Sequence, residues 1–309
     1  ATYTKAERLN WALRLPENIV DGMALQVPEL AHTRSICVFG MGNSAIAGFI
    51  LRDHADFTSH TRIAVINDNH VPNWVNKSST AIFISYSGET KEIIENYFDA
   101  RKRGSDCIAI TAGGTLFTEF QKNGDPVILL PPRSAHSRDA LGHVLGALFK
   151  AVTVISGHDF VADMEAIIPE ISAYRDQVAN DKIGIIRGTH RELEDEMPAI
   201  YAPQELYSVA MRWKIQLNEN SGYFCYFGLF PEFNHNEIMA WAHEGGVKNV
   251  TQLLIRDDGK SDVNTIVFNT SSLLNNKNVH ERMLTLTGSC NLAKILKGIM
   301  FGDALSLVE

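Results

Sequence analysis

Short apolar runs rich in isoleucine and valine recur through the first half of the chain, separated by segments in which apolar residues follow a helical period. Runs of this length are typical of strands that are buried on both faces of a parallel sheet. Their alternation with helical segments predicts an α/β fold, in which a doubly wound and mostly parallel sheet is flanked by helices. We expect the strands at 35–39, 62–66, 80–85, 106–111 and 127–130.

The best-defined helix of this half is the segment ETKEIIENYFDARKRG. Ile93, Ile94, Tyr97 and Phe98 fall on one side of it, as expected for a helix that covers a sheet. Its acidic residues come early, its basic residues come late, and Gly104 marks its end. This helix follows directly on the segment SYSG.

Helices are also expected at the two ends of the first half. The opening segment ATYTKAERLNWALRL has an amphipathic pattern, and a further helix is expected from about residue 138 to residue 155. The polar segment GHD at 157–159 then marks a boundary. We therefore expect an N-terminal domain at 1–156, which includes the leading helix, and a C-terminal domain at 157–309.

The second half repeats the alternation less cleanly, and we expect a second doubly wound domain of the same topology. The chain ends in the apolar helical segment LAKILKGIMFGDALSL. The segment VNTIVFNTSSLL stays open between strand and helix, because its β-branched residues favour a strand while its position before another strand favours a helix. Helices are expected at 161–179 and 205–219, and strands near 183–187, 198–202, 223–227 and 251–256.

Composition narrows the class of protein. A length of 309 residues predicts about two domains of roughly 150 residues each. No apolar run reaches the ~18 residues of a membrane span, and the start of the chain lacks the continuous apolar core of a signal peptide. Cys37, Cys107, Cys225 and Cys290 show neither CxxC nor zinc-type spacing, which favours reduced thiols and no metal site. We expect a cytoplasmic protein without a membrane partner.

The charge of the chain bears on its partners. The formal net charge is -8, and the lysine and arginine residues form no long basic stripe. Both features argue against a nucleic-acid partner. An anionic small molecule would therefore have to be held by local dipoles rather than by the overall charge.

Two of the predicted strands end in small hydroxyl and glycine residues, in the segments SICVFGMGNSAIAG and TAIFISYSGET. A helix is expected directly after each turn, so the hydroxyls lie where helix N-termini present free amides and a positive dipole end. The carboxyl ends of parallel strands meet at one edge of a sheet, which predicts a pocket for the phosphate of a small metabolite. The predicted phosphate-binding residues are Gly42, Asn43, Ser44, Ser85, Ser87, Gly88 and Thr90, of which the glycines and Asn43 act through backbone amides.

Two other interpretations of these segments stay open. GMGNSA satisfies the dinucleotide pattern G-x-G-x-x-A, and Asp68 follows the next strand, so a nicotinamide-dependent enzyme is an alternative. The hydroxyls of SYSGET are also the residues preferred as ordinary helix caps. Three small hydroxyl residues in SYSGET, together with the serine of GMGNS, exceed what capping requires and favour a monophosphate over a dinucleotide.

At these motifs the chain resembles a known family. GMGNS and SYSGET are similar to the two phosphate-binding segments of sugar isomerase (SIS) domains. SRDALG, LNENSG and PEFNHNEI resemble segments of the bifunctional phosphoglucose/phosphomannose isomerases of the archaeal type, and the likeness spans most of the chain. The resemblance implies two flavodoxin-like SIS domains in a homodimer. It also implies an isomerase that interconverts glucose 6-phosphate or mannose 6-phosphate with fructose 6-phosphate, without metal or organic cofactor.

The resemblance further implies three catalytic residues. Moving a proton between C1 and C2 of a sugar phosphate requires a base, a cation for the enediolate and a group that opens the ring. Glu219 in LNENSG matches the base of the family, and Asn218 and Asn220 flank it. Arg138 in SRDALG matches the arginine that faces the enediolate. His235 in PEFNHNEI matches the ring-opening histidine, which in the family comes from the partner subunit.

The sequence departs from the family at two places. Asn234 stands where the family has the first of two adjacent histidines. Family members continue into a tail with a threonine and a catalytic lysine, whereas this sequence ends at Glu309, and Lys294 and Lys297 do not match that motif. Either the tail is missing from this chain or ring opening relies on His235 alone. Because SIS domains also serve regulators, a non-catalytic sugar-phosphate sensor is the other alternative, and it would need none of the three catalytic residues.

Overall fold

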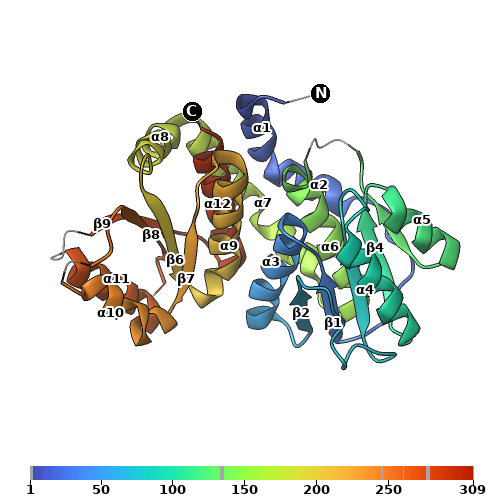
Figure 1. The fold of residues 1–309 in the computed structure, drawn as a ribbon. Coiled ribbons are helices and arrows are strands. Elements are labelled where there is room, and N and C mark those ends of the chain that lie inside the picture. The colour runs from blue at the N-terminus through green and yellow to red at the C-terminus, as the bar shows by residue number, and fades with distance from the viewer. Residues whose placement is uncertain (1–2, 133–135, 245, 260, 276–278, 309) are drawn as a thin grey trace. The chain divides into compact units, whose positions relative to one another are not determined.

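The computed structural model describes residues 3–132, 136–244, 246–259, 261–275 and 279–308, apart from the side chains of 181–184. The chain forms two compact units, each built on a parallel sheet with helices packed against it (Figure 1). The first domain contains Arg14–Ile168 and the residues before Thr4, and the second contains Thr4–Leu13 and the chain from Pro169 onward.

The division between the domains lies inside a helix. The sequence places it after residue 156, whereas the compact units divide between Ile168 and Pro169, within α7 (Phe160–Gln177). The leading helix α1 (Lys5–Ala12) belongs to the second unit rather than the first. The polar GHD segment therefore precedes a helix that runs through the division.

The opening amphipathic pattern forms two helices rather than one. Thr4 begins α1 with a capping box, in which its hydroxyl accepts from the Glu7 amide at 3.1 Å and its amide donates to the Glu7 carboxylate at 2.7 Å. Pro16 lies in the first turn of α2 (Leu15–Met23), where its missing amide hydrogen costs nothing. The proline therefore starts a new helix in place of extending the first.

The sheet of the first domain has the order β2-β1-β3-β4-β5, and all its strand pairs are parallel. This order confirms the expected flavodoxin-like winding, and the five strands confirm the predicted ones within a residue at each end. The strands are β1 Ser35–Phe39, β2 Arg62–Ile66, β3 Thr80–Ile84, β4 Asp106–Thr111 and β5 Val127–Leu129. The helices are α3 Asn43–Thr58, α4 Lys91–Lys102, α5 Gly114–Asn123, the 3₁₀ turn η1 Ser137–Ala140 and α6 Leu141–Ser156.

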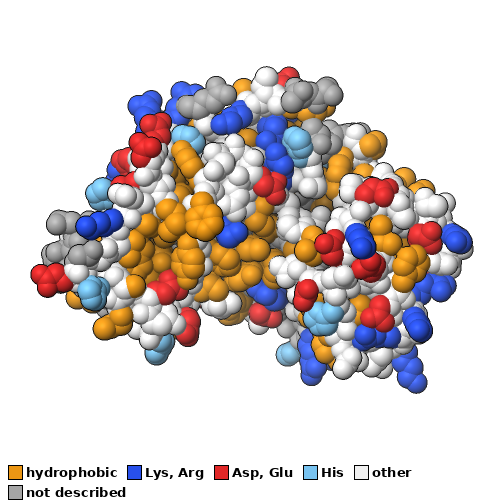
Figure 2. Space-filling model, in the orientation of Figure 1, with side chains coloured by type: hydrophobic (Ala, Val, Ile, Leu, Met, Phe, Trp, Pro, Cys, Tyr) orange, Lys and Arg blue, Asp and Glu red, His pale blue; other side chains and the backbone are white. Residues whose placement is uncertain are grey.

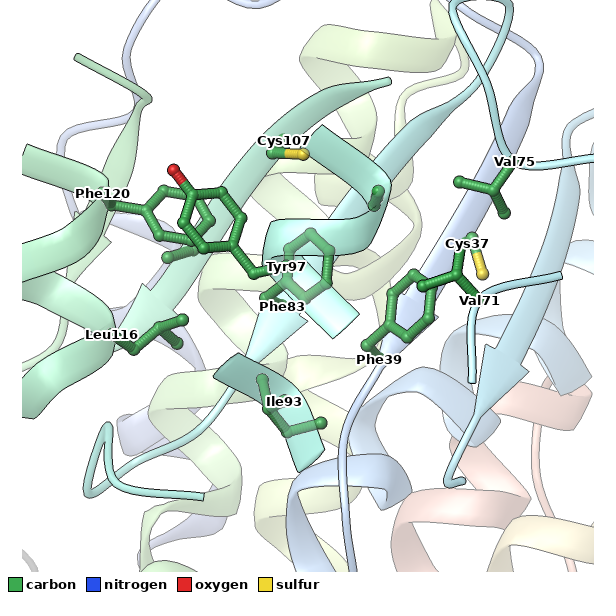
Figure 3. Close-up of a cluster of buried hydrophobic side chains, with 13 residues drawn as sticks. Cys37, Phe39, Val71, Val75, Phe83, Ile93, Tyr97, Cys107, Leu116 and Phe120 are labelled. Carbon is green, nitrogen blue, oxygen red and sulfur yellow. The ribbon is translucent and has the colours of Figure 1, made fainter. Parts of the chain in front are cut away.

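One face of this sheet packs against α4 and α5 through an aromatic cluster (Figure 3). Phe39 and Phe83, from neighbouring strands, stack with ring centroids 4.8 Å apart. Tyr97 stacks on Phe120 at 3.9 Å, and its hydroxyl donates to Asp125 at 2.5 Å. The four rings are buried, so the carboxyl ends of β1 and β3 rest on a close-packed support.

Among the described residues, one helical segment, Ser137–Ser156, has the length and apolar composition of a membrane span. In its most apolar window, 78% of the residues are buried inside the protein. The α6 part of the segment packs against α2 and α3. It is therefore a core helix of the first domain.

The second domain has a four-stranded parallel sheet of order β7-β6-β8-β9, which repeats the first four positions of the other sheet. The expected repetition of one topology is thus confirmed. The strands are β6 Met197–Pro203, β7 Tyr226–Phe230, β8 Val250–Asp257 and β9 His280–Leu286. The helices are α8 Ile183–Glu192, α9 Tyr207–Gln216, α10 Glu237–Ala242, α11 Asp262–Asn275 and α12 Asn291–Leu307. Shorter turns are the π segments η2 Val178–Lys182 and η4 Leu217–Ser221 and the 3₁₀ segments η3 Gln204–Leu206 and η5 Glu232–His235.

The strand expected near 183–187 is wrong, because these residues begin helix α8. Ile186, Thr189 and Leu193 are buried, and their spacing is that of one face of a helix. Ile185 is exposed, so the isoleucines of this segment do not share one buried environment. The apolar run therefore belongs to a helix with a buried stripe.

The structure resolves one open segment of the second domain and differs from the expectation at two strands. The ambiguous segment forms helix α11, in which Asn264, Val267, Thr270 and Leu274 are buried at helical spacing. The strand expected near 223–227 lies at β7, three residues later, and β9 was not predicted. Both β7 and β9 are edge strands, where burial of only some side chains weakens the apolar signal.

Candidate active site

The predicted phosphate-binding segments lie at the topological switch point of the first sheet. β1 and β3 are neighbours, and the chain continues from β1 to β2 on one side and from β3 to β4 on the other. Phe39 pairs with Phe83 in register, so the loops that follow β1 and β3 begin side by side at the carboxyl edge. Ligands of open α/β sheets bind in the crevice at such a point. The structure thus brings GMGNS and SYSGET together.

The first loop leads directly into α3. Gly42 has a φ of +53°, in the left-handed region that glycine enters without a steric penalty, and α3 begins at the next residue, Asn43. The Ser44 amide donates to the Met41 carbonyl at 3.0 Å, which closes the turn. Ser44 is half-buried in the first turn of α3. Its hydroxyl therefore lies at the positive end of the helix dipole.

The second loop is braced by its own hydroxyls. Ser85, which is 1% exposed, has its Oγ 2.9 Å from Thr90 Oγ1 and accepts from the Gly88 amide at 3.1 Å. Ser87 is exposed, and its Oγ accepts from the Glu89 amide at 3.2 Å. Ser85 and Thr90 hold the loop from within, whereas Ser87 lies on its outer surface.

The interpretation of Thr90 as an ordinary helix cap is wrong. Thr90 is the N-cap residue of α4, but its side chain makes no capping hydrogen bond, because its hydroxyl is engaged with Ser85. A helix that starts without a side-chain cap leaves amides of its first turn to other acceptors. This arrangement suits an anion such as phosphate.

A third loop, after β4, supports the second. Gly88 has a φ of +72°, and a Cβ at this position would lie well under 3.0 Å from the Gly113 carbonyl oxygen. The Glu89 carboxylate accepts from both the amide and the hydroxyl of Thr115, each at 2.8 Å. The contributions of Gly113, Glu89 and Thr115 to this loop were not predicted from the sequence. The available signal was the glycine pair that follows the fourth predicted strand.

Arg138 lies in η1, the 3₁₀ turn before α6, and is half-buried. η1 contacts α3, the helix that begins after the GMGNS loop of β1. Arg138 is thus placed in the first domain on a turn packed against the element that carries Ser44. A guanidinium stays charged at any ordinary pH, so the group acts as a fixed cation.

In the second domain, Glu219 lies exposed in the π turn η4, at the end of α9. The side chain of Asn218 donates to the Tyr223 carbonyl at 2.7 Å, and that of Asn220 donates to Ser306 Oγ at 3.0 Å. The two flanking asparagines therefore hold the turn that carries the carboxylate. Single π turns occur frequently at functional sites, and this one carries an exposed acid.

His235 ends η5, which follows the carboxyl end of β7. The residue is exposed. Asn234 Nδ2 donates to Thr270 Oγ1 of α11 at 2.7 Å, so the asparagine beside His235 anchors this turn. Asn236 accepts from the Glu237 amide at 2.6 Å and caps α10.

Glu219 and His235 lie at opposite ends of the second sheet. β6 and β7 run parallel, so α9 returns the chain to the amino edge before β7 begins. Glu219 precedes β7 at that edge, and His235 follows β7 at the carboxyl edge. Tyr226–Phe230 between them span about 16 Å at ~3.3 Å per residue. The structure therefore does not bring these two residues of one chain together.

Other reactive groups are less suited to catalysis. Burial raises the pKa of the thiols of Cys37, Cys107 and Cys225 to about 12, so these groups stay protonated and unreactive. Among the described residues, no group of three or more histidine, cysteine or acidic side chains is arranged to hold a metal ion.

Asp68, the acid that a dinucleotide ribose would require, is engaged within its own loop. Its carboxylate accepts from the Asn69 amide at 2.7 Å and lies 3.3 Å from His70 Nδ1. Its carbonyl accepts from Asn96 Nδ2 of α4 at 2.8 Å. These bonds give Asp68 a structural role in the loop after β2.

A cavity of about 580 Å³ lies in the second domain, away from the predicted site residues. Tyr174, Trp213 and Met283 contribute to its apolar wall. Its buried cation, Lys297, donates to Glu170 at 2.8 Å and to the Thr287 carbonyl at 2.7 Å. The charges of this cavity are therefore compensated within the protein.

Two known protein families match the chain, one within each domain. The SIS domain family matches residues 29–137, and the family described as bacterial phospho-glucose isomerase C-terminal SIS domain matches residues 189–308. The first match contains both loops predicted to bind phosphate, and the second contains Glu219 and His235.

A bifunctional phosphoglucose/phosphomannose isomerase of Thermoplasma volcanium is 30% identical over 271 residues, which cover 88% of this chain and 83% of the relative. The chain belongs to the bifunctional phosphoglucose/phosphomannose isomerase family. Another family member, from Caldicellulosiruptor bescii, is 28% identical over 317 residues, which cover 99% of this chain and 91% of the relative.

Solved structures share the fold of this family member. The C-terminal domain of glucosamine-fructose-6-phosphate aminotransferase from Francisella tularensis superposes with a TM-score of 0.74, and the match covers 99% of this chain and 95% of that one. The two sequences are 14% identical, so the comparison shows the architecture alone.

Proposed function

We propose that the protein is an aldose-ketose isomerase that interconverts glucose 6-phosphate, mannose 6-phosphate or both with fructose 6-phosphate through an enediolate. The observation that supports this most is the pair of hydroxyl-bearing loops side by side at the switch point of the first domain, in a chain of this family. In the proposed complex, the phosphate is bound by Ser44, Ser85, Ser87 and Thr90 and by the amides of Gly42, Asn43 and Gly88.

Glu219 is the proposed base. Its carboxylate would remove the proton from C2 of the aldose, or from C1 of the ketose, and return it to the neighbouring carbon. Arg138 would stabilise the negative charge that develops on the enediolate oxygen, and it would do so without exchanging a proton. In this proposal, the second domain provides the acid-base group and the first domain binds the phosphate.

His235 is proposed to open the sugar ring from a second copy of the chain. The placement of Glu219 and His235 at opposite ends of β7 supports this arrangement, because the length of the strand separates the two residues within one chain. Apolar side chains also gather on the surface over β7 and α9 (Figure 2). Phe224 and Tyr226 are 80% and 42% exposed, and a second copy would remove such a surface from water.

The proposed reaction uses side chains alone, so it requires neither a metal nor an organic cofactor. The cysteines of the chain are free thiols, which fits a reducing cytoplasm. We therefore propose a cytoplasmic homodimer whose substrate is a small sugar phosphate.

The test is an assay of the purified chain with glucose 6-phosphate and with mannose 6-phosphate, in chelator, following the appearance of fructose 6-phosphate. Turnover in chelator is expected. Binding of the sugar phosphates without turnover would instead identify the non-catalytic sensor, and tight binding of NADH in an absorbance titration would favour the dinucleotide alternative.

Glu219→Gln tests the base directly. A positioned acid-base group contributes ~10² to 10⁴-fold, so we expect at least that loss of turnover with sugar-phosphate binding retained. Glu165→Gln is the matched control, because Glu165 is an exposed carboxylate of α7 that has no proposed role. Near-normal turnover in Glu219→Gln would remove Glu219 from the mechanism.

A further inference from the structure

The π turn that carries Glu219 is anchored to the last turn of the terminal helix α12. Asn220 Nδ2 donates to Ser306 Oγ at 3.0 Å, and Ser221 Oγ donates to the Ser306 carbonyl at 3.0 Å. Ser306 is fully buried, and its own hydroxyl donates to the Asp303 carbonyl at 2.9 Å. The residues on the C-terminal side of Glu219 are thus bonded to one serine that lies far away in the sequence.

Asp303 extends this anchor into a buried ion pair. Its carboxylate accepts from Arg212 Nε at 2.9 Å and from Arg212 Nη2 at 3.1 Å, and Gln216 Nε2 donates to it at 3.0 Å. The side chains of Arg212 and Asp303 are 2% and 4% exposed. Arg212 and Gln216 lie one turn apart in the second half of α9, and Gln216 is its last residue, so the carboxylate fixes the helix up to the start of the turn.

Side chains of α9 also pack directly against the backbone of α12. A Cβ on Gly298 would lie 2.7 Å from Val209 Cγ1, and a Cβ on Gly302 would overlap the Trp213 ring. Trp213 Nε1 donates to the Gly298 carbonyl at 2.8 Å, and its ring stacks on Phe301. Packing of this density leaves the two helices little freedom to shift against each other.

We propose that Ser306 and Asp303 are positioning residues for the Glu219 carboxylate. Asp303 holds the α9 side of the π turn through Arg212 and Gln216, and Ser306 holds the other side through Asn220 and Ser221. Neither residue needs to touch the sugar. The inference rests on the proposed function, because it assigns the anchored turn to the catalytic base.

Ser306→Ala is the main test, because it removes the hydroxyl that joins Asn220 to α12. A displacement of about 1 Å of a catalytic group can cost ~10²-fold, so we expect kcat to fall at least about tenfold. KM should change by less than about twofold, since the phosphate is bound in the first domain. Ser221→Ala, at a half-buried position, should lower kcat less and leaves the buried network intact.

Ser105→Ala is the matched control. Ser105 is also a buried serine, 7% exposed, whose hydroxyl donates to a backbone carbonyl, that of Ser79, at 2.8 Å. It lies before β4 in the first domain, at the amino edge of that sheet. Removal of the Ser105 hydroxyl should leave kcat unchanged. This comparison distinguishes the positioning role of Ser306 from the general effect of removing a buried hydroxyl.

The double variant Glu219→Gln with Ser306→Ala shows whether the serine acts through the base. If it does, the second substitution causes no further loss of the residual turnover, because the group that it positions is already gone. An equal further loss would overturn the inference while leaving the isomerase proposal standing. An unchanged kcat in Ser306→Ala would also overturn the positioning role and leave the isomerase proposal standing.

Hydrogen exchange of the amides of 217–221 gives a readout that does not depend on activity. These amides should exchange faster in Ser306→Ala than in the unmodified chain or in Ser105→Ala. Unchanged exchange would overturn the anchoring even if the chain turns over sugar phosphates. If the unmodified chain shows no turnover, the proposed function fails, and faster exchange would still support the anchor.

Discussion

Gly88→Ala is expected to weaken sugar-phosphate binding while the chain still folds. At Gly88 the backbone has a φ of +72°, and the new methyl group would overlap the Gly113 carbonyl oxygen of the neighbouring loop. That oxygen is part of the backbone and cannot rotate away. One of the two loops must therefore move, and with it the amides and hydroxyls that are proposed to face the phosphate.

The size of the effect follows from two contributions. A left-handed residue other than glycine costs about 1–2 kcal/mol, which a domain with a stability of about 5–15 kcal/mol tolerates. Each hydrogen bond to a charged group contributes about 1.5–3 kcal/mol. Losing one such bond to the phosphate weakens binding by about 10- to 150-fold.

The chain offers a matched control at Gly104. Gly104 has a φ of +82°, but the nearest atom to a methyl group added there is Lys77 Cβ, in ordinary contact at 3.8 Å. Gly104→Ala therefore causes the same kind of backbone strain without the overlap. Binding of fructose 6-phosphate would be measured by calorimetry in the Glu219→Gln background, and unfolding would be followed in urea. Equal affinities in the two alanine variants would refute the placement of the phosphate at this loop.

Three further outcomes are expected. Arg138→Lys should lower turnover more than affinity, because a compact ammonium group replaces a planar guanidinium with several fixed N–H donors. A change in KM alone would show that the residue acts in binding. Burial lowers the pKa of His54 below its ordinary 6.5, although its bond to Asp163 opposes this effect. The unfolded chain therefore binds more protons than the folded chain as pH falls below about 6.5, so the free energy of unfolding decreases with falling pH. In His54→Gln, urea unfolding should show a smaller decrease of this free energy over the same pH range. Mixing Glu219→Gln and His235→Asn chains should restore part of the turnover that each lacks alone, whereas no recovery would place both residues in one subunit's site.

The sequence predicts the first domain closely, and the reason lies in its burial. β1, β3 and β4 are buried on both faces, so continuous apolar runs such as those around Ile36, Ile82 and Ile108 mark the strands without ambiguity. The hydroxyl clusters after β1 and β3 are local as well. Their meeting at one edge follows from the parallel order alone.

The second domain shows where such prediction ends. β9 is an edge strand whose first residues, His280, Glu281 and Arg282, are polar, so its pairing with β8 has no signal in the sequence. The isoleucine-rich segment of α8 has the composition of a strand, yet its buried residues follow a helical spacing set by tertiary packing.

The parts of the site that depend on distant contacts were not predicted. The close approach of Gly88 to Gly113 and the bond from Asn220 to Ser306 join residues from different elements. Asp303 is the single acid of the terminal apolar helix. A lone acid among apolar residues was the signal in the sequence that it has a buried partner. The partner, Arg212, could be identified only once the two helices were seen together.

The most direct test of the central claim is the exchange of substrate hydrogen with solvent. Fructose 6-phosphate would be incubated with the chain in D₂O, and deuterium at C1 of the recovered ketose would be measured by NMR. We expect incorporation by the unmodified chain and by Glu165→Gln, and loss of that incorporation in Glu219→Gln, which still binds the sugar phosphate. Incorporation by Glu219→Gln at the unmodified rate would contradict the assignment of the base.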